Sequence, residues 1–381
     1  MIYLHIPFCK SFCTYCDFYS ELCSGKGLQQ VQNFVDGVCR EIDERREEID
    51  AARAQSVKTL YVGGGTPSAI PVESLRILVG KLGYRDYDEF TVEVNPDDIT
   101  AGGEEYVREL KSLGVNRVSM GVQSFDDGIL KWMNRRHTSA GALEAFRLLR
   151  AAGFDNISID LIFGLSQLGE EKWIGTIRKA LDLCPEHISA YQLSIEEGSA
   201  LAGMVRDGRY TEAPDEQCRS QYDILCHELG KAGYNHYEIS NFCKPGKHSR
   251  HNSSYWSGIP YLGCGASAHS FDTHSRQWNV SSLLDYIKGI ENNEPDFEIE
   301  ELDSTTRFNE YVMTGLRTSK GIDLDKVESL FGDNLCHYLQ KQMQKHIKQS
   351  SLVQEGNNIK LSHQGIFISD GIMSDLMSVE D

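Results

Sequence analysis

The sequence predicts an α/β fold, a partial (β/α)6 barrel followed by a small helical, winged-helix-like C-terminal domain. Short β-branched or aromatic runs alternate with longer amphipathic stretches, the alternation weakens after about residue 195, and helices flank a small hairpin near the C-terminus. Strands that alternate with helices imply right-handed crossovers and a parallel sheet. Six such units fall short of the eight that close a complete barrel, so we expect a sheet that stays open on one side.

Six runs predict the strands of this sheet, at 2–6, 57–62, 89–95, 116–122, 156–162 and 187–193. Amphipathic stretches between them predict helices at 28–50, 72–82, 103–113, 138–152 and 169–183. Gly114, Gly153 and the region around Pro185 mark returns from helix to strand, because glycine and proline commonly end helices.

The rest of the chain shows a different pattern. After the sheet we expect a helix at 215–233, a strand at 234–239 and an irregular segment at 241–258. The C-terminal region predicts helices at 303–318 and 324–349, a hairpin at 352–361 that turns at Gly356, and a final helix at 363–378. We therefore divide the chain into a barrel domain with its extension, 1–295, and a C-terminal domain, 296–381. The acidic residues of this second domain favour an interaction or lid module.

Composition limits the classes of protein. Of the 381 residues 40% are hydrophobic, enough for a substantial core, and the net charge of −18 disfavours tight binding of nucleic acid. No apolar run approaches the ~20 residues of a membrane helix, and Met1 leads into an apolar strand without a basic leader. Eleven mostly scattered cysteines suit a reducing compartment. We expect a cytoplasmic protein, with the membrane surface as an alternative location, and the sequence leaves the oligomeric state open.

Three cysteines near the N-terminus, Cys9, Cys13 and Cys16, carry the strongest functional signal. Cysteine thiolates hold iron–sulfur clusters, and a 4Fe–4S cluster normally takes four of them. Three closely spaced cysteines would leave one iron open to a small molecule. Structural zinc is an alternative, but it usually needs a second pair of ligands, and no compact pair follows.

Glycines and polar residues lie at the carboxyl ends of the predicted strands, where ligands bind in parallel α/β folds. A Gly-Gly-Gly-Thr-Pro segment at 63–67 follows the second strand, and glycines let a backbone approach a ligand closely. Glu93 and Asp160 lie within apolar strands, where a carboxylate is costly to bury unless it is paired or bound. With Gln123 and Arg135 they would supply acceptors and a cation to one barrel mouth. Structural hydrogen bonds are the alternative role of the two carboxylates.

These motifs resemble, in the same order, those of one known family over nearly the whole chain. The cysteine segment, the glycine segment, Glu-Val-Asn-Pro at 93–96, Met-Gly-Val-Gln-Ser-Phe at 120–125 and Ile-Asp-Leu-Ile-Phe-Gly-Leu at 159–165 are similar to the oxygen-independent coproporphyrinogen III oxidases and related haem chaperones of the radical S-adenosylmethionine superfamily. The resemblance implies a 4Fe–4S cluster on Cys9, Cys13 and Cys16. It implies that S-adenosylmethionine is bound by Tyr3, Tyr15, Gly64, Gly65, Thr66, Glu93, Gln123, Arg135, Asp160 and Ser194.

Three features resemble the haem chaperone branch more than the oxidases. Phe18 stands where the oxidases have a fourth cysteine, and the chain starts at the cysteine motif without their N-terminal extension. The segment His-Asn-Ser-Ser-Tyr-Trp at 251–256 resembles the haem motif of the chaperones, which implies that His251 binds haem. An imidazole can ligate haem iron, and aromatic rings can pack on the macrocycle. A structural role for His251 stays open, as do the alternative ligands His248, His269 and His274.

The resemblance therefore implies a haem chaperone that passes haem to an acceptor protein, expected among respiratory haem enzymes. The alternative is an oxygen-independent coproporphyrinogen III oxidase, which decarboxylates propionates oxidatively in haem biosynthesis. A radical enzyme with another substrate, including RNA, is a third hypothesis, which the negative charge disfavours. No catalytic residue is assigned.

Overall fold

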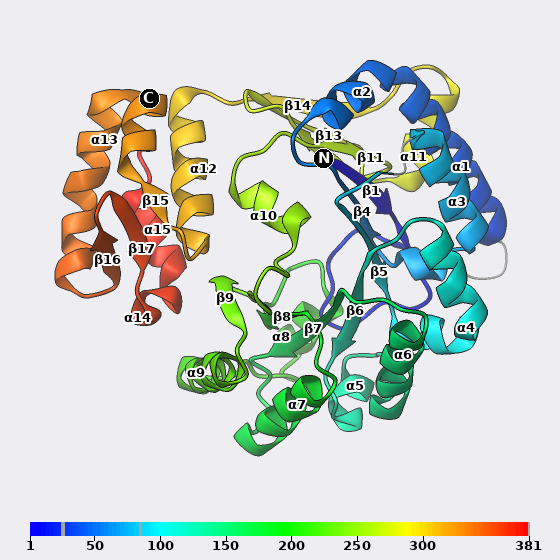
Figure 1. Ribbon diagram of the computed structural model, residues 1–381, viewed down its shortest axis with the longest axis horizontal. Helices are drawn as coiled ribbons and strands as arrows, with labels where there is room; N and C mark the ends of the chain where they lie inside the picture. Colours follow the sequence, from blue (N-terminus) through cyan, green and yellow to red (C-terminus); the bar gives the residue numbers. More distant parts are fainter. Residues whose placement is uncertain (24–26, 84–85, 380–381) are drawn as a thin grey trace.

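The computed structural model describes residues 1–23, 27–83 and 86–379. Figure 1 shows a fan of strands with helices around it and, beside it, a helical body in orange and red. Across the described residues the main sheet has nine strands in the order β11-β1-β4-β5-β6-β7-β8-β10-β9. The six predicted strands are confirmed as β1 (Ile2–Ile6), β4 (Thr59–Gly64), β5 (Glu89–Val94), β6 (Arg117–Gln123), β7 (Ile157–Phe163) and β8 (His187–Gln192). They pair in parallel in this order, which confirms the predicted partial barrel.

Three short strands extend the sheet at its edges. β11 (Leu262–Cys264) pairs in parallel with β1, while β10 (Asn241–Cys243) and β9 (Asn235–Glu238) continue antiparallel from β8. The prediction of an irregular segment at 241–258 is wrong, because that segment contains β10 and the helix α10 (Arg250–Trp256). Their three and seven residues are too few to show a hydrophobic period in the sequence.

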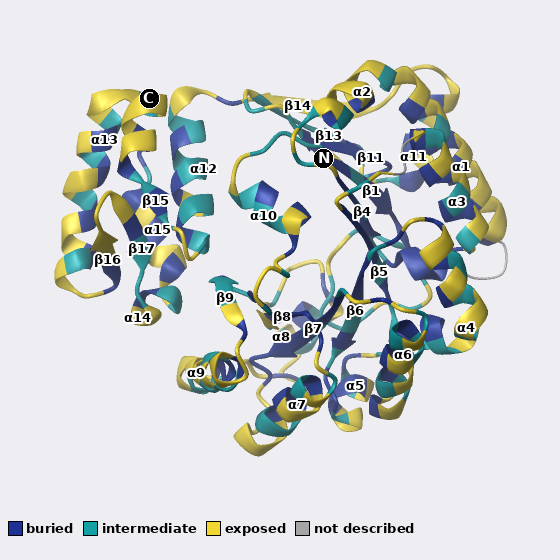
Figure 2. Ribbon diagram, in the orientation of Figure 1, coloured by how far each residue is buried: buried dark blue, intermediate teal, exposed yellow. Residues whose placement is uncertain are grey.

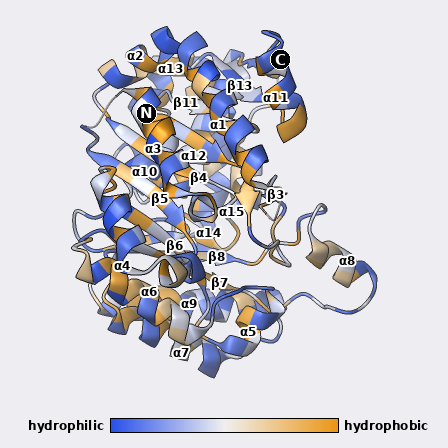
Figure 3. Ribbon diagram, turned by 90° about the vertical axis from the view of Figure 1, so that its right-hand side faces the viewer, coloured by the Kyte–Doolittle hydropathy of each residue, from blue (hydrophilic) through white to orange (hydrophobic). Residues whose placement is uncertain are grey.

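The helices pack outside the sheet. Figure 2 shows buried strands within a ring of helices whose outer turns are exposed, and Figure 3 shows hydrophilic and hydrophobic turns alternating along those helices. Their bounds are α1 (Gly27–Glu44), α2 (Arg46–Ala54), α3 (Val72–Leu82), α4 (Pro96–Ser112), α5 (Asp127–Trp132), α6 (Ser139–Ala151), α7 (Glu170–Asp182), α8 (Ala200–Arg206), α9 (Asp215–Lys231) and α11 (Leu283–Glu291).

Two predicted helix ranges need correction. The single helix predicted at 28–50 is two helices, because the backbone leaves helical geometry at Arg45, whose guanidinium donates a 2.9 Å hydrogen bond to the carbonyl of Gly263. The helix predicted at 103–113 begins earlier, at Pro96, and bends at Gly103, where φ is 60°. The spacing of apolar residues in the sequence predicts neither a tertiary contact nor a bend at a glycine.

Side chains alternate along the strands and so divide the core from the cavity. On β6 the apolar residues Val118, Met120 and Val122 are buried in the main hydrophobic core, together with apolar residues of the surrounding helices. The intervening positions 117, 119, 121 and 123 face the interior of the barrel. The same alternation in neighbouring strands brings Glu93 and Asp160 to the inside of the barrel.

Small elements complete the barrel region. A pair of two-residue strands, β2 (Phe8–Cys9) and β3 (Glu21–Leu22), brackets the cysteine loop, and a 3-10 turn, η1 (Pro67–Ala69), follows the glycine segment. A separate antiparallel sheet contains β12 (His269–Phe271), β13 (Ser275–Asn279) and β14 (Phe297–Glu301). In the described part of the chain, no helix is long and apolar enough to cross a bilayer.

The C-terminal region has its own hydrophobic core, which includes Phe308, Leu339 and Ile359. Its predicted hairpin is confirmed, and the predicted final helix is two short helices separated near Phe367. The boundary between 295 and 296 stays a proposal, because β14 pairs across it with β13. The elements of this region are α12 (Ser304–Arg317), β15 (Ile322–Asp323), α13 (Leu324–Lys348), β16 (Leu352–Glu355), β17 (Asn358–Leu361), α14 (His363–Ile366) and α15 (Ser369–Leu376).

Candidate functional site

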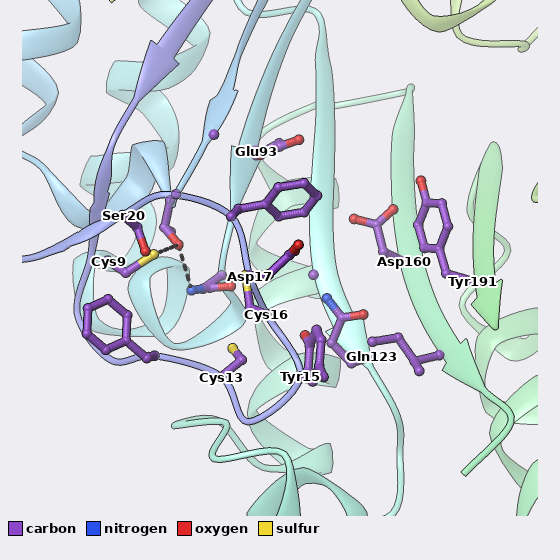
Figure 4. A pocket seen from close by; sticks show the side chains of 18 of the residues that line it. Cys9, Cys13, Tyr15, Cys16, Asp17, Ser20, Glu93, Gln123, Asp160 and Tyr191 are labelled. Carbon is purple, nitrogen blue, oxygen red and sulfur yellow. Dashed lines mark hydrogen bonds between the residues drawn. The ribbon is translucent and has the colours of Figure 1, made fainter. Parts of the chain in front are cut away.

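A cavity of about 1200 Å³ opens at the carboxyl ends of the barrel strands. Figure 4 shows the three cysteines on one side of it and Asp160 and Tyr191 on the other. Two predicted site residues, Tyr3 and His251, do not line this cavity. Twelve do: Cys9, Cys13, Tyr15, Cys16, Gly64, Gly65, Thr66, Glu93, Gln123, Arg135, Asp160 and Ser194.

The cysteine loop is held in place by the segment that follows α5. Asn134 Nδ2 donates a 2.7 Å hydrogen bond to the carbonyl of Phe12, and Thr14 bonds the carbonyls of Trp132 and Met133. Asn134 adopts a left-handed conformation with φ of 58°, which asparagine tolerates better than most residues. These contacts join a loop from the first strand to one from the fourth unit, and they fix the three thiols at the cavity wall.

The thiols lie in an environment that fits an iron–sulfur cluster. Arg135 Nη1 donates a 3.3 Å hydrogen bond to Cys13 Sγ, and Cys9 Sγ lies 3.5 Å from Thr66 Oγ1. Burial raises the pKa of the Cys16 thiol to about 11, so the thiolate needs a cationic partner, which a bound metal supplies. No three His, Cys, Asp or Glu side chains of the described chain converge on a single metal ion. Thiols spread along one loop instead suit a cluster, which binds each thiolate at a different iron.

The glycine segment passes close beneath the cysteine loop. Gly64 has φ of 113°, and a Cβ atom at Gly65 would lie 2.7 Å from the carbonyl oxygen of Phe8. The amide of Thr66 donates a 2.7 Å hydrogen bond to that same oxygen. Residues larger than glycine would therefore push the two loops apart. The binding of S-adenosylmethionine by Gly64 and Gly65 stays a prediction.

Two carboxyl groups face the cavity from neighbouring parts of the sheet. Burial, with a smaller contribution from the nearby Asp160, raises the pKa of Glu93 to about 7, although Tyr61 Oη donates a 2.6 Å hydrogen bond to Glu93. Burial also raises the pKa of Asp160, whose oxygens both lie 3.4 Å from Ser119 Oγ. Few protein donors reach either group, so both retain capacity to accept hydrogen bonds from a ligand.

Gln123 and Arg135 lie at the mouth in constrained geometries. Gln123 ends β6 with φ of 63°, a strained conformation that is frequent at ligand sites. Arg135 Nη2 donates to Asn95 Oδ1 at 2.5 Å and to the carbonyl of Gly121 at 2.7 Å. The guanidinium is thus fixed between the cysteine loop and β6, where it can attract an anionic group.

Tyr3 lies inside the barrel but away from the cavity. Its hydroxyl is 3.1 Å from Nδ1 of His5, and its ring packs 6.1 Å from that of Tyr61. A direct contact of Tyr3 with S-adenosylmethionine stays a prediction, and the structure gives this residue a packing role.

His251 belongs to the barrel floor, which we define as the amino ends of the strands together with α10 (Arg250–Trp256). Only 1% of His251 is exposed. Its Nδ1 is 2.8 Å from Thr59 Oγ1 and its Nε2 is 2.9 Å from Tyr255 Oη. Burial lowers the pKa of His251 to about 3. In this arrangement neither nitrogen is free for a haem iron, so haem ligation by His251 stays a prediction that requires Tyr255 to move.

Comparisons of the sequence with known proteins identify the family. The sequence model of the Radical SAM superfamily matches residues 3–180, and that of the HemN C-terminal domain matches residues 302–368. The heme chaperone HemW of Bacillus subtilis is 33% identical over 377 residues, which cover 97% of this chain and 97% of that protein. The chain belongs to the HemW family. The HemW of Escherichia coli is 34% identical over 273 residues, 70% of this chain and 69% of that protein.

A solved structure shares the fold of this HemW family chain. Coproporphyrinogen III oxidase (HemN) from Escherichia coli, a radical SAM enzyme, superposes with a TM-score of 0.84 and covers 100% of this chain and 90% of the oxidase chain. Their sequences are 20% identical, so the likeness shows a common fold and does not extend to activity.

Several cavity-lining residues of this HemW family member were not predicted from the sequence, and three of them are Arg117, Tyr191 and Asn252. Arg117 begins β6, Tyr191 lies on β8, and Asn252 belongs to α10. Arg117 had a visible signal, since a charged residue starts an otherwise apolar strand in phase with Gly121 and Gln123. Asn252 had none, because its place in the cavity depends on where α10 packs.

Proposed function

We propose that this chain is a haem chaperone that holds a 4Fe–4S cluster and S-adenosylmethionine at the barrel mouth, binds haem and delivers it to an acceptor protein. The observation that carries this proposal is the 33% identity to a heme chaperone over 97% of both chains. Cys9, Cys13 and Cys16 would ligate three irons of the cluster, as the resemblance implies. The donor set fits, because three thiols share one wall of the cavity.

S-adenosylmethionine would lie beside the cluster, against the glycine segment. Glu93 and Asp160 offer carboxyl oxygens to its hydroxyl and ammonium groups, and Arg135 offers a cation to its carboxylate. A reduced cluster supplies an electron to this molecule in the superfamily. The residues themselves orient the ligand and restrict the access of water, since the cysteine loop covers one side of the cavity.

The mouth also has an apolar rim that suits a porphyrin. Phe12 is 49% exposed and Phe18 is 72% exposed, and both line the cavity. Large exposed aromatic rings beside a cavity provide flat apolar surface for a macrocycle. Phe18 occupies the position of the oxidases' fourth cysteine, which supports carriage of haem rather than oxidation of its precursor.

The test is anaerobic reconstitution with iron and sulfide, followed by haem titration and transfer. We expect about one haem per chain, a Soret band, and movement of haem to an acceptor apoprotein. A parallel assay supplies coproporphyrinogen, S-adenosylmethionine and a reductant, and we expect no consumption of the porphyrinogen. Consumption would support the oxidase instead, and a reconstituted protein that binds no haem would contradict the proposal.

A further inference from the structure

Arg117 is a buried cation without a counter-ion in contact. It is 1% exposed, and no carboxylate oxygen of the described residues lies within 4.0 Å of its guanidinium. Its single hydrogen bond within the described chain is a long one, 3.4 Å from Nη1 to Thr91 Oγ1, and its Nε atom has no partner. A buried charge without a partner is strongly unfavourable, so a bound anion would stabilise this side chain.

Glu93 and Asp160 are the acidic groups that Arg117 influences, but neither forms an ion pair with it. Glu93 accepts a hydrogen bond from Tyr61, and Asp160 accepts from Ser119. Arg117 influences both carboxyl groups through space and lowers their pKa values, yet it touches neither. Its guanidinium therefore keeps donors available towards the cavity, which it lines.

Arg117 lies deeper in the cavity than Arg135, the cation predicted to face the carboxylate of S-adenosylmethionine. Its hydrogen bond to Thr91, its register partner on β5, keeps the guanidinium near the amino end of the strands. Gly121, which Arg135 contacts, lies four residues further along β6, about 13 Å at the usual rise of a strand. Asn252 of α10 lines the same cavity from the floor. The cavity therefore has one arginine at the mouth and another at depth.

We propose that Arg117, together with Asn252, binds a carboxylate of the transported ligand, a propionate group of haem. This inference rests on the proposed function. A guanidinium forms two parallel hydrogen bonds with a carboxylate, and the amide of Asn252 adds a neutral donor. The carboxylate of S-adenosylmethionine fits less well, because the resemblance places that group on the cluster at the mouth. A propionate extends only two methylene groups from its macrocycle, so this contact requires one edge of the macrocycle to enter the cavity from the aromatic rim.

The experiment compares haem with haem dimethyl ester, in which both propionates are blocked. Anaerobically reconstituted protein is titrated with each porphyrin, and S-adenosylmethionine binding is measured in parallel. We expect the wild-type protein to bind haem at least about tenfold more tightly than the ester. Arg117→Gln should remove most of this preference by weakening haem binding alone, and Asn252→Ala should reduce it by about threefold.

Arg136→Gln is the matched control, since Arg136 also lines the cavity but pairs with Asp97 at 3.1 Å. It should retain the preference for haem. If Arg117→Gln does not fold, Arg117→Lys keeps the charge, loses the paired hydrogen bonds, and should show an intermediate preference. If the wild-type protein binds both porphyrins with equal affinity, the inference about the propionate is wrong, but the proposed function as a haem chaperone is unaffected. A loss of S-adenosylmethionine affinity with haem affinity unchanged also overturns it, and binding of neither porphyrin removes the proposed function itself.

Discussion

The mouth and the floor of the barrel hold polar side chains in opposite ways. At the floor, Glu89 accepts hydrogen bonds of 3.2, 2.7 and 3.0 Å from Ser249 Oγ and the amides of Arg250 and His251. At the mouth, Cys9 Sγ lies 3.5 Å from Thr66 Oγ1 and Cys13 Sγ accepts a 3.3 Å hydrogen bond from Arg135 Nη1, and sulfur is a weak hydrogen-bond acceptor. Polar groups that satisfy one another stabilise the fold, whereas polar groups that face a cavity with few partners await a ligand. The polar groups of the floor thus form a closed hydrogen-bond network that stabilises the fold, and those of the mouth form a ligand-binding site.

The largest expected effect concerns the mouth. Cys13→Ser should abolish the iron–sulfur absorbance and the bound iron after anaerobic reconstitution, because a hydroxyl does not replace a thiolate ligand. The unfolding free energy should change little, since Cys13 lies at the cavity wall.

Cys39→Ser is the control, because Cys39 lies on α1 outside the cavity. It should retain full iron content. If the Cys13→Ser variant kept the cluster, the mouth of the barrel would not be the site that binds it, and the contrast between mouth and floor would fail.

The residues at the mouth could be predicted from the sequence because they come from short contiguous motifs at strand ends. The cysteine segment and the glycine segment each keep their spacing in the structure, and twelve predicted residues line one cavity. The floor was not readable, because its contacts join residues far apart in the chain. His251 meets Thr59 across 192 positions, and Glu89 meets Ser249 across 160. The charge of Arg117 at the start of a strand was visible in the sequence, but its lack of an ion-pair partner among the described residues depends on what surrounds it in space.

The second effect tests the floor. Glu89→Gln replaces a carboxylate that accepts three hydrogen bonds by an amide with one acceptor oxygen, so α10 should lose part of its attachment. We expect the unfolding free energy in urea to fall by about 2–3 kcal/mol, with the iron content unchanged.

Glu144→Gln serves as the matched surface control, since the Glu144 side chain is 54% exposed. It should change stability by less than about 0.5 kcal/mol. A Glu89→Gln variant as stable as this control would show that the floor network contributes nothing.

The third effect is the pH dependence of the mouth. The pKa of Glu93 is about 7 in the folded protein against an ordinary 4.5, so between these values the folded state holds a proton that the unfolded state has released. The unfolding free energy should therefore fall as pH rises from 4.5 to 7, by at most roughly 3 kcal/mol.

Glu93→Gln should remove this part of the pH dependence, measured by urea denaturation at about pH 5 and about pH 8. The variant should gain most relative to wild type at the higher pH. An unchanged slope of stability against pH would mean that Glu93 is ionised throughout this pH range.

The smallest expected effect concerns His251, a residue of the floor that is also predicted to bind haem. His251→Gln leaves Thr59 or Tyr255 without its partner, and we expect the unfolding free energy to fall by about 1–2 kcal/mol. Tyr255→Phe is the companion variant, because it removes one of the two hydrogen bonds and frees Nε2. If His251 ligates haem iron, His251→Gln shifts the Soret band and Tyr255→Phe does not weaken haem binding. If the Soret band and the haem affinity of His251→Gln match those of wild type, the imidazole belongs to the closed network of the floor and the iron is bound elsewhere in the cavity.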